Sequence, residues 1–112
     1  MQRTEKPKLI TKIIRFNHAW KLAQQQFGEN SNLAKSLRDQ KACLQAELLR
    51  DHAGTYLIFD KNAESEEPLY SVQFDSSISL PDLLYKDDAE HIPVRIAQKL
   101  FSENELLKLV RE

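Results

Sequence analysis

Residues 8–27 read KLITKIIRFNHAWKLAQQQF, and this stretch decides the N-terminal part of the fold. Its apolar side chains recur at alternating steps of four and three residues, which places them on one face of an α-helix. Pro7 precedes this stretch, at a position where a helix does not use the backbone N–H. Gly28 follows directly after it, and glycine commonly ends a helix. The pattern predicts one long helix over residues 8–27 with a buried seam of Leu9, Ile13, Phe16, Trp20, Ala23 and Phe27.

A second helix follows after a short connection. The polar residues 29–32 are typical of a turn followed by a helix N-cap. Gly54 indicates where this helix ends. We therefore expect a helix over about residues 32–52, and two helices joined so closely should pack as an antiparallel hairpin. Four leucines fall close together on one face of this helix: Leu33, Leu37, Leu44 and Leu48.

The period of the apolar pattern then changes from helical to alternating. Residues 55–60 (TYLIFD) are β-branched and aromatic, with apolar side chains for both faces of a strand. Residues 69–75 (LYSVQFD) alternate between apolar and polar side chains. The connection over residues 61–68 is acidic and polar, so the sequence predicts a two-stranded antiparallel β-hairpin with a long exposed loop.

The C-terminal part shows weaker signals. We expect a loop over residues 76–79, a short helical turn over residues 82–85 and a polar segment over residues 86–91. Pro93 begins a helix over residues 94–101, and Ser102 to Glu105 match a capping box that begins another helix near residue 103.

These segments predict an α+β fold in a single domain over residues 1–112. Its parts are an N-terminal antiparallel helical hairpin, a central two-stranded antiparallel β-hairpin and short C-terminal helices. The chain of 112 residues is long enough to bury a core without metal or disulfide staples.

Composition indicates a cytoplasmic protein. Cys43 is the only cysteine, so no intramolecular disulfide can form. The apolar residues near the N-terminus are interrupted by Thr11 and Lys12, unlike a signal peptide, and no apolar run is long enough to span a membrane. We therefore expect no membrane contact.

No pattern indicates catalysis, and we expect no catalytic residue, no cofactor and no metal. The two glycines, Gly28 and Gly54, lie too far apart for a phosphate-binding loop. Cys43 has neither a cysteine partner for zinc nor a readable base to activate its thiol. The three histidines lack metal-ligand spacing, and each has an ordinary structural explanation: His18, His52 and His91.

Charge is uneven along the chain, although the formal net charge is only −1. Residues 1–21 carry six cations against one acid, whereas residues 60–90 carry nine acids against two lysines. Lys8, Lys12 and Arg15 step by four and three residues along the first helix, and we call them the basic ridge. They either form a solvated helix flank or contact an acidic partner or the phosphates of a nucleic acid.

The first strand offers apolar side chains to both of its faces: Tyr56, Leu57, Ile58 and Phe59. A two-stranded hairpin is marginal alone, and free strand edges invite pairing with another chain. These four residues are therefore the predicted interface of a homodimer. In the alternative, residues 94–110 fold back and cover the strand within one chain.

The leading hypothesis is a non-catalytic protein–protein interaction or regulatory module that forms a homodimer. A first alternative is an accessory nucleic-acid-binding protein that uses the basic ridge. A second alternative is a small enzyme whose site residues meet only in three dimensions, which a pocket around His91 or His52 would favour.

Overall fold

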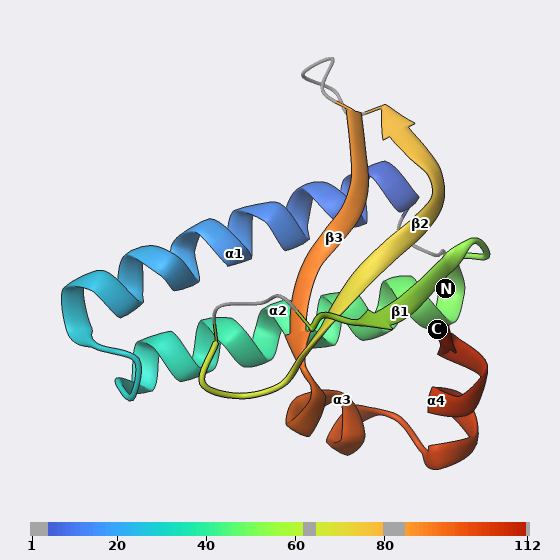
Figure 1. Cartoon of the computed structure of the whole chain (residues 1–112). Helices are drawn as coiled ribbons and strands as arrows, with labels where there is room; N and C mark the ends of the chain where they lie inside the picture. Colours follow the sequence, from blue (N-terminus) through green and yellow to red (C-terminus); the bar gives the residue numbers. More distant parts are fainter. Residues whose placement is uncertain (1–4, 62–64, 80–84, 112) are drawn as a thin grey trace.

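The structure of the chain is a computed structural model that describes residues 5–61, 65–79 and 85–111. Figure 1 shows the elements along the chain. In order they are α1 (Lys6–Phe27), α2 (Asn32–Asp51), β1 (Thr55–Phe59), β2 (Leu69–Ser79), β3 (Tyr85–Pro93), α3 (Val94–Leu100), α4 (Glu103–Leu109) and β4 (Val110–Arg111).

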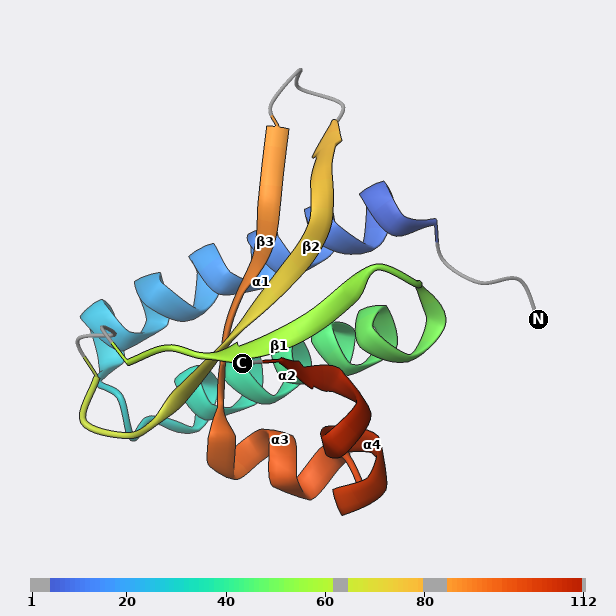
Figure 2. The same ribbon diagram turned by 45° about the vertical axis from the view of Figure 1, so that its right-hand side comes forward.

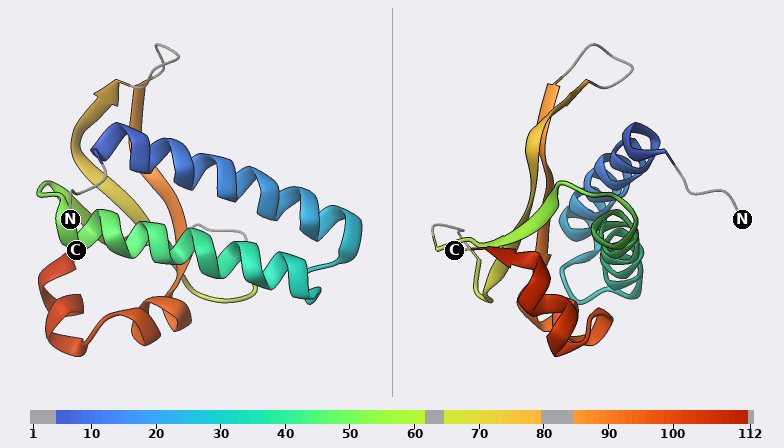
Figure 3. Two further views of the ribbon diagram at one scale, coloured as in Figure 1. Left: turned by 180° about the vertical axis from the view of Figure 1, so that it is seen from behind. Right: turned by 90° about the vertical axis from the view of Figure 1, so that its right-hand side faces the viewer.

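The elements form two layers (Figures 2 and 3). The antiparallel helices α1 and α2 lie against one face of a four-stranded sheet, whose strand order is β3-β2-β1-β4. The pairs β1–β2 and β2–β3 are antiparallel, and β4 pairs in parallel with β1. Because α3 and α4 lie at one end of the sheet beside α2, no described helix covers the second face of the sheet.

The core fills the space between the hairpin and the sheet. Leu9, Ile10 and Ile13 on the N-terminal half of α1 are fully buried there. Leu57 of β1 and Val72 of β2 are paired across the ladder and are also fully buried. Side chains directly opposite each other share one face of a sheet, so both point toward the helices.

The predicted α+β class, with an N-terminal helical hairpin and short C-terminal helices, is confirmed, but the sheet has four strands rather than two. β2 extends to Ser79 across the predicted loop, and β3 occupies the segment that we expected to be polar and irregular. The predicted helical turn over residues 82–85 lies outside the described residues except for Tyr85, which begins β3.

The buried face of each helix is rotated relative to the predicted one, and the α1 seam is confirmed in part. Leu9, Ile13 and Ala23 of the α1 seam are buried, whereas Phe16 and Trp20 are only half-buried. The seam ends in solvent because the C-terminal part of α1 extends beyond the sheet (Figure 1). Its last member, Phe27, is 62% exposed.

In α2 the buried face is turned away from the predicted leucine stripe. Leu48 is fully buried, but Leu33 is 50% exposed. The inward positions are occupied instead by three alanines, Ala34, Ala42 and Ala46. Two polar residues, described below, share this buried face.

The C-terminal segment is tied to the rest of the chain. The capping box at Ser102 is present, and its Glu105 also pairs with Arg50 of α2 at 2.9 Å. The hydrogen bond from Arg50 lowers the pKa of Glu105 to about 2. β4 pairs with β1 through Leu57 and Val110, so the chain itself covers part of the β1 edge.

Candidate functional site: a buried lysine beside a polar cleft

A cleft of about 730 Å³ lies where the helical hairpin extends past β3, the edge strand of the sheet. We call it the Lys41 cleft. α1 and α2 form one side of it, and the start of β2, β3 and α3 form the other. Its helix side includes Asn17, Trp20, Lys21, Arg38 and Lys41, and its strand side includes Glu90, His91 and Arg95.

Lys41 is the most unusual residue of the cleft because its side chain is a buried cation. The residue is only 3% exposed. Its Nζ donates a hydrogen bond to Asn17 Oδ1 at 2.9 Å and lies 4.5 Å from the centre of the Trp20 ring. The amide oxygen and the face of the indole replace part of the water that the ammonium loses.

These surroundings lower the pKa of Lys41 to about 8. The largest cause is desolvation, which disfavours the charged amine. The nearby Glu90 carboxylate opposes this shift, and the positive charge of Lys21 adds to it. Lys41 is therefore mostly charged at neutral pH, but it loses its proton far more readily than an exposed lysine.

The backbone of β3 is strained where it faces this lysine. Glu90 has φ +66°, a left-handed conformation that few side chains other than asparagine or aspartate adopt. Its N–H donates to Asp88 Oδ1 at 3.2 Å. Such strain persists only where the surrounding structure enforces it.

Gln45 of α2 supplies that enforcement. It is fully buried, and its Nε2 donates to the carbonyl oxygens of Ala89 at 2.8 Å and His91 at 3.1 Å, the two residues that flank Glu90. Its Oε1 finds no hydrogen-bond partner among the described residues. One amide group thus holds the kink that brings Glu90 toward Lys41.

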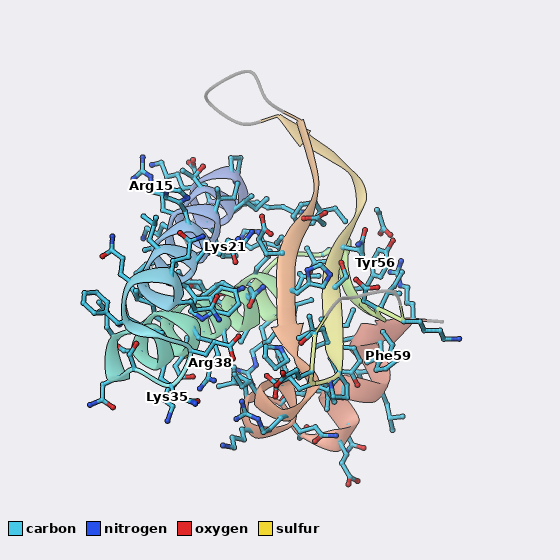
Figure 4. All side chains as sticks on the ribbon, turned by 60° about the vertical axis from the view of Figure 1, so that its left-hand side comes forward. Arg15, Lys21, Lys35, Arg38, Tyr56 and Phe59 are labelled. Carbon is cyan, nitrogen blue, oxygen red and sulfur yellow. The ribbon has the colours of Figure 1, made fainter. Side chains whose placement is uncertain are left out.

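Both signs of charge line the cleft. Lys21 and Arg38, which Figure 4 labels, lie with Lys41 on the helix side, and Arg38 Nη2 also pairs with Asp39 Oδ1 at 3.1 Å. Glu29 lines the cleft at the α1–α2 turn, and Glu66 lines it in the segment before β2. Arg95 Nε and Glu67 Oε2 pair at 3.3 Å, so their charges compensate each other.

The basic ridge lies elsewhere on the hairpin. Lys8, Lys12 and Arg15 are all exposed on one flank of α1, and none of the three makes an ion pair with another described residue. The three side chains therefore lie together on the exposed surface of α1.

The predicted interface residues do not form one surface. Leu57 is part of the core and is fully buried within one chain, so it offers nothing to a second chain. The guanidinium of Arg111 covers Tyr56, with its carbon 4.0 Å from the ring centre. Ile58 is half-buried, and Phe59 is 45% exposed while its ring packs edge-on against Tyr70.

The histidines and the cysteine take separate positions. His18 and Cys43 are exposed, and His52 caps the C-terminus of α2. His91 lies on β3, within the segment that we expected only to be polar, and its Nε2 is 2.7 Å from Asp60 Oδ2. Across the described ranges, no three histidine, cysteine or acidic side chains group as metal ligands.

Lys41 and Gln45 were not among the predicted site residues, although the sequence of α2 carries a signal for them. Both share one helical face with Ala34 and Leu48. Two polar residues within an otherwise apolar stripe indicate a buried polar cluster. The leucines at positions 33, 37 and 44 had instead indicated a different buried face.

A scan of protein-family models found no match to this sequence, and searches of curated proteins and of solved structures found no significant match either. None of the helices in the described part of the chain is long and apolar enough to cross a membrane.

Proposed function

We propose that the protein is a non-catalytic interaction module that binds an acidic segment of a partner protein in the Lys41 cleft. The observation that carries the proposal is the buried Lys41 ammonium on the helix side of an open cleft. Lys21 and Arg38 add positive charge on the same side. An acidic side chain of the partner is the natural complement of these three cations.

The shape of the cleft suits an extended peptide segment. The Lys41 cleft is polar and runs from Glu29 at the α1–α2 turn to Arg95 at the start of α3. An extended chain can follow such a path and place a carboxylate near the hairpin.

Recognition then depends on side chains rather than on strand addition to β3. Gln45 already binds the carbonyl groups of Ala89 and His91. Asp88 and Glu90 add negative charge to this edge strand, a common protection against edge pairing. The partner segment therefore lies against the hairpin and does not become a fifth strand.

Selection from a random linear-peptide phage library tests the proposal. We expect enrichment of peptides rich in aspartate and glutamate, and calorimetry should show that a selected peptide binds the full chain. Lys21→Glu with Arg38→Glu should weaken that binding at least about tenfold, since both charges are reversed. Lys8→Glu with Lys12→Glu, a matched charge change on the basic ridge, should leave it unchanged. Equal losses in both variants, or no enrichment, would reject the cleft as the binding site.

Homodimerisation remains a prediction, and the structure removes one reason for it. β4 and α4 contact β1 within one chain, so the strand does not need a second subunit as cover. Sedimentation equilibrium at micromolar concentration distinguishes a 13.0 kDa monomer from a dimer. A dimer that persists in the Phe59→Ser variant would show that a surface other than β1 holds the two chains together.

Nucleic-acid binding is a second candidate, favoured by the exposure of the basic ridge. Fluorescence anisotropy with short DNA and RNA duplexes at about 50 mM salt tests it, because phosphate contacts weaken steeply as salt rises. Reversal of Lys8, Lys12 and Arg15 to glutamate should abolish binding. Absence of binding by the wild-type chain would eliminate this candidate.

A further inference from the structure

We infer that the Lys41 amine forms a reversible imine with a small carbonyl compound that carries a carboxylate or phosphate group. The inference goes beyond the proposed function and does not rest on it. Binding of an acidic segment uses the charge of Lys41, whereas imine formation uses the lone pair of its neutral amine.

The position of Lys41 suits this chemistry. The side chain lines a cleft large enough for a small ligand, and Asn17 and Trp20 hold its Nζ in place. With a pKa of about 8, roughly a tenth of Lys41 is neutral at pH 7, against less than about a thousandth for an ordinary lysine. A larger share of the Lys41 amine is thus available as a nucleophile than in an ordinary lysine.

The reaction balances without an oxidant or reductant. Lys41 Nζ attacks the carbonyl carbon, a C–N bond forms, and one proton passes from the nitrogen to the oxygen to give a carbinolamine. The hydroxyl then takes up a second proton and leaves as water while the nitrogen lone pair forms the C=N bond, and the nitrogen gives up its second proton, so both protons of the amine end in the water. Glu90 lines the same cleft and interacts electrostatically with Lys41, so its carboxyl group is placed to carry protons between nitrogen and oxygen.

The charges of the cleft indicate the class of carbonyl compound. Lys21 and Arg38 lie on the same side of the cleft as Lys41. An anionic group on the ligand would meet these cations while the carbonyl carbon reaches Nζ. Oxo acids and phosphorylated aldehydes combine the two groups that the cleft requires.

Pyridoxal 5′-phosphate is the probe, because it joins an aldehyde to a phosphate. The full chain is incubated with it, reduced with borohydride and mapped by peptide mass spectrometry. We expect Lys41 to be labelled faster than any other lysine, with a pH profile that rises to a midpoint near pH 8. The N-terminal amine, which also titrates near this pH, is resolved in a separate peptide. Labelling of Lys41 no faster than that of the exposed Lys35 would overturn the inference.

Three comparisons separate reaction at a built site from incidental labelling. Glyoxylate, an anionic aldehyde, should label Lys41 at least about tenfold faster than uncharged propanal if the cations select the ligand. Glu90→Gln removes a charge that raises the pKa of Lys41, so it is compared above about pH 9, where the Lys41 amine is mostly neutral in both proteins. There it should slow labelling at Lys41 but not at Lys35. Lys41→Arg keeps the charge and cannot form an imine, so it should lose the label yet bind a selected acidic peptide. If Lys21→Glu abolishes peptide binding but leaves the labelling of Lys41 unchanged, the cation is not needed for labelling. The proposal that the ligand carries an anionic group would then be wrong.

Discussion

The two ends of the helical hairpin differ in what they bury. The end beneath the sheet buries Leu9, Ile13 and Leu48, which contact other apolar side chains. The end that extends past β3 buries Asn17 and Lys41, which contact each other. Apolar burial stabilises a fold directly, whereas a buried charge recovers its desolvation cost only in part. The first end therefore maintains the fold, and the second keeps an amine in an environment that changes its chemistry.

The largest predicted effect lies at the apolar end. Leu48→Ala should lower the free energy of unfolding by about 2–5 kcal/mol, because it empties a fully buried site. Trp20→Ala should cost less, about 1–2 kcal/mol, since the ring is only half-buried. Urea unfolding of both variants measures the difference. Equal losses would show that both ends contribute equally to stability, which would contradict the difference described above.

The second prediction concerns pH at the polar end. Folded Lys41 has a pKa of about 8 against 10.5 when unperturbed, so the unfolded state binds more protons between these values. Stability should therefore rise with pH across this window, by up to about 3 kcal/mol, and be lowest below it.

Lys41→Met is the matched variant for this measurement. It removes the titrating group, so the difference between its unfolding free energy and that of the wild type should change only between about pH 8 and 10.5. A constant difference across that range would mean that the folded structure does not perturb Lys41.

The third prediction concerns Gln45. Gln45→Met fills the same space but leaves the carbonyl oxygens of Ala89 and His91 without their hydrogen-bond donor. The free energy of unfolding should therefore fall by about 1–3 kcal/mol. Gln40→Met on the exposed face of α2 is the control and should change stability by less than about 0.5 kcal/mol. A similar, small effect in both variants would show that β3 keeps its kink without Gln45.

The smallest predicted effect isolates backbone strain at Glu90. Both Glu90→Ala and Glu90→Gly remove the carboxylate, but only glycine adopts a positive φ without steric cost. Glu90→Gly should therefore be more stable than Glu90→Ala by about 1 kcal/mol or less, measured by thermal unfolding. If alanine is the more stable of the two, the left-handed conformation is not maintained in solution.

Sequence periodicity was sufficient to predict that the helices, β1 and β2 exist, but it did not predict β3. The helical spacing from Leu9 to Ala23 reflects burial that the structure contains. In β3, Ala89 and Ile92 are both fully buried although they lie three residues apart. The kink at Glu90 changes which side chains face the core on either side of it. Buried and exposed residues therefore do not simply alternate along this strand.

The candidate site was less predictable than the fold for a related reason. Lys41 and Asn17 lie on different helices, and Glu90 follows much later in the chain. Their proximity depends on how far the hairpin extends past the edge of the sheet, which no local pattern encodes. Only the polar interruption of the α2 stripe by Lys41 and Gln45 was visible in advance.

β4 has a consequence for local opening. The strand pairs with β1 at only two positions, and the side chain of Arg111 adds a 2.7 Å contact to Asp75. So short a pairing should open without global unfolding, and amide hydrogens that it protects should exchange with solvent at a lower free energy than those of Val72 in the core. Each opening also exposes backbone groups of Leu57 and Ile58 as a template for another strand. Hydrogen exchange along β1 would thus report how often this chain becomes prone to aggregation.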